Sequence, residues 1–293
     1  MMKNSMRQTV MAALLAVATI LPLQAGASEA GLPLDRFPTD KLDDQVALQH
    51  GAKLFVNYCL NCHAAAVMRY NRLTDLGLTE EQIRANLMLA GEKVGEQMKI
   101  AMSPADAKQW FGATPPDLSL IARARASGSG SGADWLYTYL RSYYRDASRP
   151  TGWNNAVFPN VGMPHVFWEL QGERGATIED VMAVKDAASG KVTGTVRVST
   201  TYDRNGVSSE KTEQVTGHGG EHGSTIKFGP AQGGKLDAAS YDAAVADLVA
   251  YLTYMADPSA HTRTRVGVWV LLFLAIFAAA AWNLNRVFWR DVH

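Results

Sequence analysis

The chain has 293 residues, enough for one large domain or two small ones, and 47% of them are hydrophobic, which allows a substantial core. Its formal net charge is zero, and this balance argues against a nucleic acid as a partner.

The first 27 residues have the pattern of a secretory signal peptide. Two cations precede an apolar run over residues 10–21, and small residues at 25–27 form a cleavage site. A retained membrane anchor is the alternative, but the run is short and Pro22 follows it. We therefore expect removal of residues 1–27 and export of a body that covers residues 28–262.

A helix is expected directly before the first cysteine. Acidic residues at 43 and 44 suit its first turn. Its apolar positions recur at helical spacing, and they are Leu48, Ala52, Phe55, Val56 and Cys59. Such a helix would carry the cysteine to the edge of a cofactor.

The motif C-x-x-C-H at Cys59, Cys62 and His63 is the most informative feature of the chain. It is typical of c-type haem attachment, in which both thiols bond to the haem and the histidine binds the iron. A zinc site needs about four ligands, whereas the chain has only two cysteines. A redox dithiol is the other alternative, but no βαβ pattern accompanies the motif. We expect one covalently bound haem c.

Further helices are predicted by caps and apolar spacing. They are expected at residues 79–100, 118–125, 135–144 and 240–256. The second of these follows Pro115-Pro116 and ends in two arginines, Arg123 and Arg125. These arginines could pair with haem propionates. They could also simply interact favourably with the dipole at the carboxy-terminal end of the helix, and the residues alone leave both interpretations open.

Residues 148–165 are irregular and rich in proline, and they contain the best candidate for a second iron ligand, Met163. A loop can bring a thioether to the haem, and Pro164 would fix the backbone beside it. Methionine and histidine are the usual ligand pair of electron-transfer haems. His165 is the rival ligand, two residues away.

Residues 172–236 differ in composition from the rest, with many Gly, Thr, Ser and Val. Alternating valines and a turn at 203–206 predict a β-hairpin insertion. Within it, His218 and His222 belong to an H-x-x-E-H pattern that occurs in metalloproteases. That motif needs a helix, and two adjacent glycines between the histidines make one improbable.

Residues 266–282 carry no charge and no proline, and they could just span a membrane as a helix. A buried core helix is the alternative, but nothing follows that could cover it. We expect residues 263–293 to form a transmembrane anchor with a short cytoplasmic tail. The preceding body would then lie on the exported side of that membrane.

The chain resembles the cytochrome c1 family, the haem subunits of the cytochrome bc1 complex, or ubiquinol–cytochrome c reductase. The resemblance is carried by the C-x-x-C-H segment, by Pro115-Pro116-Asp117-Leu118-Ser119 with the arginines that follow, and by the carboxy-terminal region from Asp247 through Asp257-Pro258 to the anchor. It covers most of the chain outside residues 172–236.

The resemblance implies an all-α, cytochrome c-like fold with one carboxy-terminal anchor, to which the sequence adds the peripheral hairpin. It implies thioether bonds to Cys59 and Cys62, iron ligation by His63 and Met163, and a haem contact for Arg125. It extends to Pro116 as a haem-contacting residue. His165 departs from the family pattern and leaves the local loop shape open.

The function implied by the resemblance is single-electron transfer without catalysis by this chain alone. The donor would be a Rieske iron–sulfur subunit, the acceptor a soluble or tethered cytochrome c, and the assembly a dimer that also contains cytochrome b and contacts membrane lipid. A free-standing membrane-anchored cytochrome is one alternative. An exported thiol–disulfide oxidoreductase is another.

Overall fold

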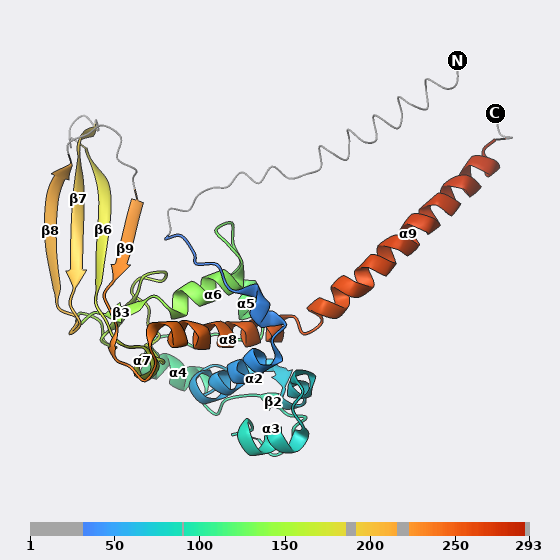
Figure 1. Ribbon diagram of the computed structural model, residues 1–293, viewed down its shortest axis with the longest axis horizontal. Helices are drawn as coiled ribbons and strands as arrows, with labels where there is room; N and C mark the ends of the chain where they lie inside the picture. The colour runs from blue at the N-terminus through green and yellow to red at the C-terminus, as the bar shows by residue number, and fades with distance from the viewer. Residues whose placement is uncertain (1–31, 90, 186–191, 216–222, 291–293) are drawn as a thin grey trace.

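The computed structural model describes residues 32–290 apart from 90, 186–191 and 216–222. A helical body lies at the centre, a four-stranded sheet extends from one side of it, and a long helix leaves from the other side (Figure 1). The expected signal peptide at residues 1–27 and the H-x-x-E-H pattern at 218–222 lie outside the described residues.

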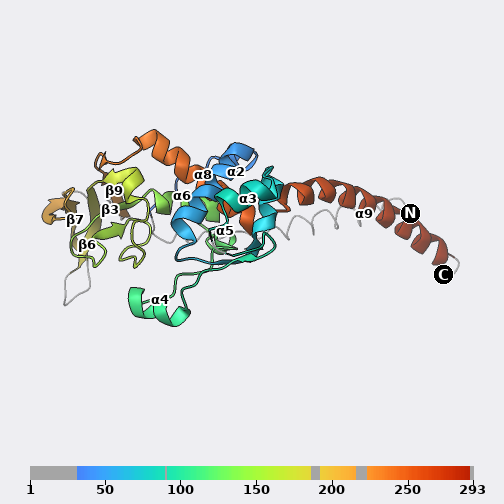
Figure 2. The ribbon, with the colours of Figure 1, turned by 90° about the horizontal axis from the view of Figure 1, so that it is seen from below.

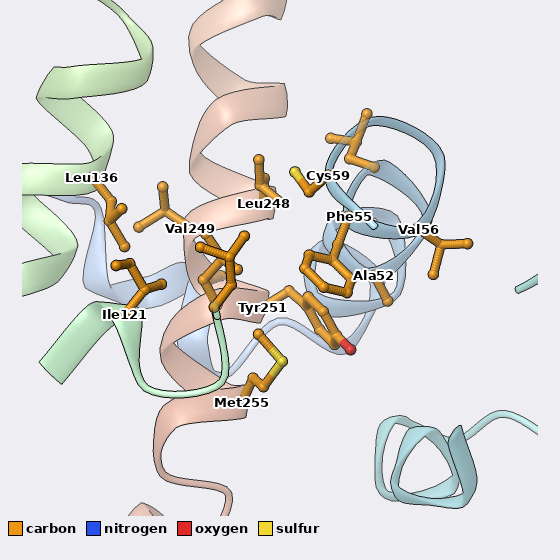
Figure 3. Close-up of a cluster of buried hydrophobic side chains, with 14 of the residues drawn as sticks. Ala52, Phe55, Val56, Cys59, Ile121, Leu136, Leu248, Val249, Tyr251 and Met255 are labelled. Atoms are coloured by element: carbon orange, nitrogen blue, oxygen red, sulfur yellow. The ribbon is translucent and has the colours of Figure 1, made fainter. Parts of the chain in front are cut away.

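Helix α8 is the centre of the body and packs against α2, α5 and α6. The helices of the body are α2 (Gln45–Leu54), α3 (Glu80–Asn86), α4 (Pro104–Phe111), α5 (Ile121–Ala124), α6 (Gly132–Leu140), α7 (Trp168–Gln171) and α8 (Ala238–Ala256). Short 3-10 helices at Thr39–Leu42 and Tyr70–Leu76 complete it. Figure 3 shows Leu248 and Val249 of α8 in the apolar cluster with Ile121 and Leu136.

The helix predicted before the first cysteine is confirmed. The Asp44 carboxylate accepts hydrogen bonds from two backbone amides of the first turn and so starts α2. A π-helix, Phe55–Cys59, continues α2 as far as the cysteine. Gly51 allows α2 to approach α8 closely, because a Cβ at this position would overlap the backbone of Asp247.

Three other predicted helices are shorter than expected, and the one expected at residues 118–125 is reduced to α5. Among the described residues of the segment 79–100, only α3 is helical, and strand β2 (Gln97–Met98) lies near the end of the segment. Over residues 135–144, α6 ends at Leu140 and strand β3 (Tyr143–Arg145) begins three residues later. In Figure 2, α4 projects from the body on its own.

The expectation of an all-α fold is wrong. Among the described residues, strands form four antiparallel sheets, three of them two-stranded and within or beside the body. These pairs are β1 (Ala65–Arg69) with β2, β3 with β4 (Trp153–Asn155), and β5 (Gly172–Glu173) with β10 (Gln232–Gly233). Short paired strands of this kind have too few residues for a readable alternation, so the sequence pattern did not show them.

The insertion at residues 172–236 is a sheet rather than a hairpin. Its strands are β6 (Ala176–Lys185), β7 (Val192–Tyr202), β8 (Ser208–Val215) and β9 (Gly223–Phe228), in the order β8-β7-β6-β9. The predicted hairpin corresponds to β7 and β8. The β5–β10 pair forms the stem through which the chain enters and leaves the sheet.

The carboxy-terminal helix α9 (Ala260–Phe288) is long and apolar enough to cross a membrane over Thr262–Phe288. None of its most apolar window is buried against the rest of the chain. This exposure contradicts the alternative of a buried core helix and agrees with the predicted anchor.

Candidate haem-binding site

Cys59, Cys62 and His63 lie on a single turn at the end of the π-helix. The backbone amides of Cys62 and His63 both donate to the carbonyl of Cys59, at 3.1 and 2.9 Å. Both thiols are free, and that of Cys59 is buried. The turn places all three side chains in the wall of one cavity of about 350 Å³.

The cavity is mainly apolar and is built by elements far apart in sequence. The cysteine turn, the Pro115-Pro116 segment, α5, α6, α8 and the irregular loop before α7 all contribute to it. Its volume lies in the range of preformed ligand and cofactor pockets. Because so many segments converge there, the cavity depends on the whole body rather than on the motif alone.

His63 is oriented by a carbonyl. Its Nδ1 lies 2.7 Å from the carbonyl oxygen of Pro116, so Nδ1–H donates and Nε2 keeps its lone pair. Burial lowers the pKa of His63 and favours this neutral state. The Pro116 segment is itself fixed, because the Leu118 amide donates to the Ala64 carbonyl.

Met163 lines the cavity, whereas its rival does not. The Met163 sulfur accepts a hydrogen bond from the Tyr139 hydroxyl at 3.4 Å. The His165 ring is buried away from the cavity, stacked on Tyr143 and edge-on to Trp153. Burial lowers the pKa of His165 to about 3, so this imidazole is neutral.

The two arginines that follow Pro116 have different surroundings. Arg125 lines the cavity, and its guanidinium lies 4.4 Å from the centre of the Trp135 ring. Arg123 instead forms an ion pair with Asp257 and donates to the carbonyl of Ala256. Of the two, only Arg125 is therefore placed to meet a group in the cavity.

Several cavity residues were missed by the sequence analysis. Trp135 and Tyr139 are one turn apart on α6, and Leu248 and Leu252 are one turn apart on α8. The spacing was visible in the sequence as an aromatic-rich helix and an apolar stripe. What could not be seen is that these faces border a cavity rather than a filled core.

The donor set fits haem c. Two thiols, an imidazole with a free Nε2, a thioether and one guanidinium line a cavity with apolar walls. The same structure disfavours a redox dithiol, because burial raises the pKa of the Cys59 thiol to about 12. A reactive cysteine requires a thiolate near neutral pH.

Comparisons with known proteins identify the family of the chain. The family model of the Cytochrome C1 family matches residues 36–174. A protein of Nitrosomonas europaea named ammonia monooxygenase gamma subunit is 38% identical over 280 residues, which cover 96% of this chain and 97% of the relative. Cytochrome c1 of Allochromatium vinosum is 37% identical over 289 residues, 98% of this chain and all of the relative.

A more distant relative is cytochrome c1 of Rhodospirillum rubrum, 28% identical over 276 residues, which cover 85% of this chain and 83% of the relative. The similarity to the first two relatives spans nearly the full length of both chains. It therefore includes the insertion and the anchor as well as the cavity. The chain belongs to the cytochrome c1 family.

Proposed function

We propose that this chain is the haem subunit of a bacterial quinol–cytochrome c reductase and passes single electrons from a Rieske iron–sulfur protein to a cytochrome c. The family is one of haem-containing electron-transfer proteins, and the cofactor is a covalently bound haem c. The observation that carries the proposal is one cavity lined by Cys59, Cys62, His63 and Met163, on a chain with a helix able to span a membrane.

When bound, the haem supplies reversible one-electron iron chemistry. Cys59 and Cys62 would hold it covalently, and His63 Nε2 and Met163 sulfur would bind its iron. The Pro116 carbonyl keeps His63 in the tautomer that leaves Nε2 free. Arg125 would pair with a propionate, and the apolar walls would exclude water.

The ligand pair supports electron transfer rather than catalysis. With the iron bound by both a methionine and a histidine of the chain, as is usual for electron-transfer haems, a substrate would have no open site on it. Histidine–methionine ligation also raises the haem reduction potential. On its own, the chain would therefore carry electrons, and the quinol chemistry would belong to the assembled complex.

The proposed placement follows from the two ends of the chain. Residues 1–27 would direct export and be removed, residues 28–262 would form the periplasmic haem domain, and residues 263–293 would anchor it in the inner membrane. The proposed partners are cytochrome b and a Rieske protein, in a dimeric complex with contacts to lipid. The names of the bacterial relatives support this proposal over a free-standing cytochrome.

The test is extraction of the native membrane in mild detergent, with an affinity tag on this chain. We expect a dihaem cytochrome b and an iron–sulfur protein to copurify, and the spectrum to show both b-type and c-type haem. If the chain purifies alone while other respiratory complexes stay intact, the reductase is excluded and a free-standing cytochrome takes its place.

A further inference from the structure

The segment that carries Met163 is held by side chains rather than by regular secondary structure. Within the described residues, no backbone–backbone hydrogen bond reaches residues 157–164. A loop without such bonds has many accessible conformations, and fixing it costs conformational entropy. Some other set of contacts must therefore determine where the methionine sulfur lies.

Asn155, at the end of β4, supplies the first set of contacts. It is fully buried, and its Oδ1 accepts from the amides of Val157 and Phe158 at 2.9 and 3.0 Å. Its Nδ2 donates to the Tyr139 carbonyl at 2.8 Å. The Tyr139 hydroxyl in turn donates to the Met163 sulfur. The side chain of Asn155 therefore links the start of the loop to helix α6, and α6 contacts Met163 near the end of the loop.

Asn154 and Arg149 hold the middle of the loop. The Oδ1 of Asn154 accepts from the Asn160 amide at 2.8 Å, and its Nδ2 donates to the Asp146 carboxylate. Arg149 donates to the side chain and the carbonyl of Asn160. Asn160 has a φ of 61°, a left-handed conformation that asparagine tolerates better than most residues.

From these contacts we infer that Asn155, assisted by Asn154 and Arg149, is the positioning residue that holds Met163 where its sulfur could bind the haem iron. The inference rests on the proposed function, because it concerns the residue proposed to bind the iron. Asn155 does not line the cavity. It acts through the loop, and its effect should therefore appear in the strength of the methionine–iron bond and not in haem attachment.

The experiment compares wild type with Asn155→Ala in the full-length, haem-loaded chain. The readings are the reduction potential, the sulfur-to-iron charge-transfer band of the oxidised protein, and carbon monoxide binding by the reduced protein. Loss of one buried hydrogen bond shifts an equilibrium about tenfold. We therefore expect at least about tenfold more haem that binds carbon monoxide, a lower potential, a weaker band and unchanged covalent haem.

Thr138→Val is the matched control. Thr138 is also buried and lies next to Tyr139 on α6, but its hydroxyl accepts from the Asp35 amide and donates to the Asp134 carbonyl, not to Asn155 or the loop. It should lower the melting temperature without changing the potential or carbon monoxide binding. If both variants change these readings alike, or if Asn155→Ala leaves them unchanged, the positioning role is wrong.

A second variant covers the case in which Asn155→Ala fails to yield folded protein. Arg149 is half-buried, and Arg149→Gln removes the bonds to Asn160 from the outer side of the loop. It should shift the three readings in the same direction by a smaller amount, and wild-type values would overturn the inference. Failure of the ligand proposal is distinct, because wild type itself would then lack the charge-transfer band and Met163→Leu would not change carbon monoxide binding.

Discussion

His63 shows how single residues prepare this site. Its Nδ1 is engaged by the Pro116 carbonyl, and burial keeps the ring neutral, so Nε2 is available to a metal before any cofactor binds. The motif in the sequence predicted the histidine, and the structure adds the Pro116 carbonyl that orients it. The structure adds Tyr139, whose hydroxyl contacts the Met163 sulfur.

The first prediction concerns Cys59 and Cys62. With both replaced by Ser, the hydroxyls cannot form thioether bonds, and the haem-stained band in a denaturing gel should disappear. The wild-type chain should keep its haem under the same conditions. If acid and acetone extract the haem from the wild-type protein, covalent attachment is wrong.

The second prediction concerns Met163→Leu. Leucine keeps an apolar side chain in the cavity but offers no ligand, so covalent haem should remain while the reduction potential falls and carbon monoxide begins to bind. Met182→Leu is the control, because Met182 is exposed on the distant sheet. An unchanged potential in Met163→Leu would point to another ligand.

At the scale of elements, the sequence predicted the helices, which depend on spacing within one segment, and missed strands that pair with distant segments. The helix that carries Cys59, helix α8 and the anchor follow from apolar spacing along one segment. Strand β6 alternates apolar residues at Ile178, Met182 and Val184, but Asp180 interrupts the pattern. Strand β6 pairs along one edge with β9, whose first residue is Gly223. A partner this far along the chain cannot be predicted from the pattern of β6 itself.

The turn between β7 and β8 joins the four-stranded sheet to the helical body. The Ala147 amide donates to the Gly206 carbonyl at 2.9 Å, and the ring of Tyr202 lies against that of Tyr144. Gly206 has a φ of 84°, and a Cβ there would lie 2.6 Å from the Ala147 nitrogen. Asp146, which precedes this contact, is the residue that binds Asn154.

The third prediction follows from that contact. Gly206→Val should lower the free energy of unfolding by about 1–3 kcal/mol, because valine strains a left-handed backbone and displaces Ala147. Chemical denaturation of the haem-loaded protein measures it. Gly194→Val on β7 is the control, since its Cβ would meet no atom. Equal losses in both variants would contradict the importance of the turn.

At the scale of the whole molecule, the haem body and the anchor meet at one short connection. Asp257 lies between α8 and α9, and its carboxylate pairs with Arg123 from the body and with Arg263 from α9. Along α9, every described side chain from Thr262 to Trp289 is exposed except at Gly267. The anchor therefore adds membrane attachment without contributing to the core around the cavity.

The fourth prediction concerns this separation. A chain that stops before Arg263 should be exported, carry haem and fractionate as a soluble protein with the wild-type spectrum. Salt or carbonate washing should leave the full-length chain in the membrane. Recovery of the shortened chain from the bilayer would mean that the amino-terminal segment is retained.

The most direct test of the proposed function is the reduction of this haem by quinol in the purified assembly, followed by rapid mixing and absorption at the c-type band. We predict that quinol reduces the haem, that an inhibitor of the quinol-oxidising site blocks the reduction, and that added oxidised cytochrome c then takes the electron. A c-type haem that stays oxidised while the b-type haems are reduced, or that is reduced equally fast with the site blocked, would contradict the account.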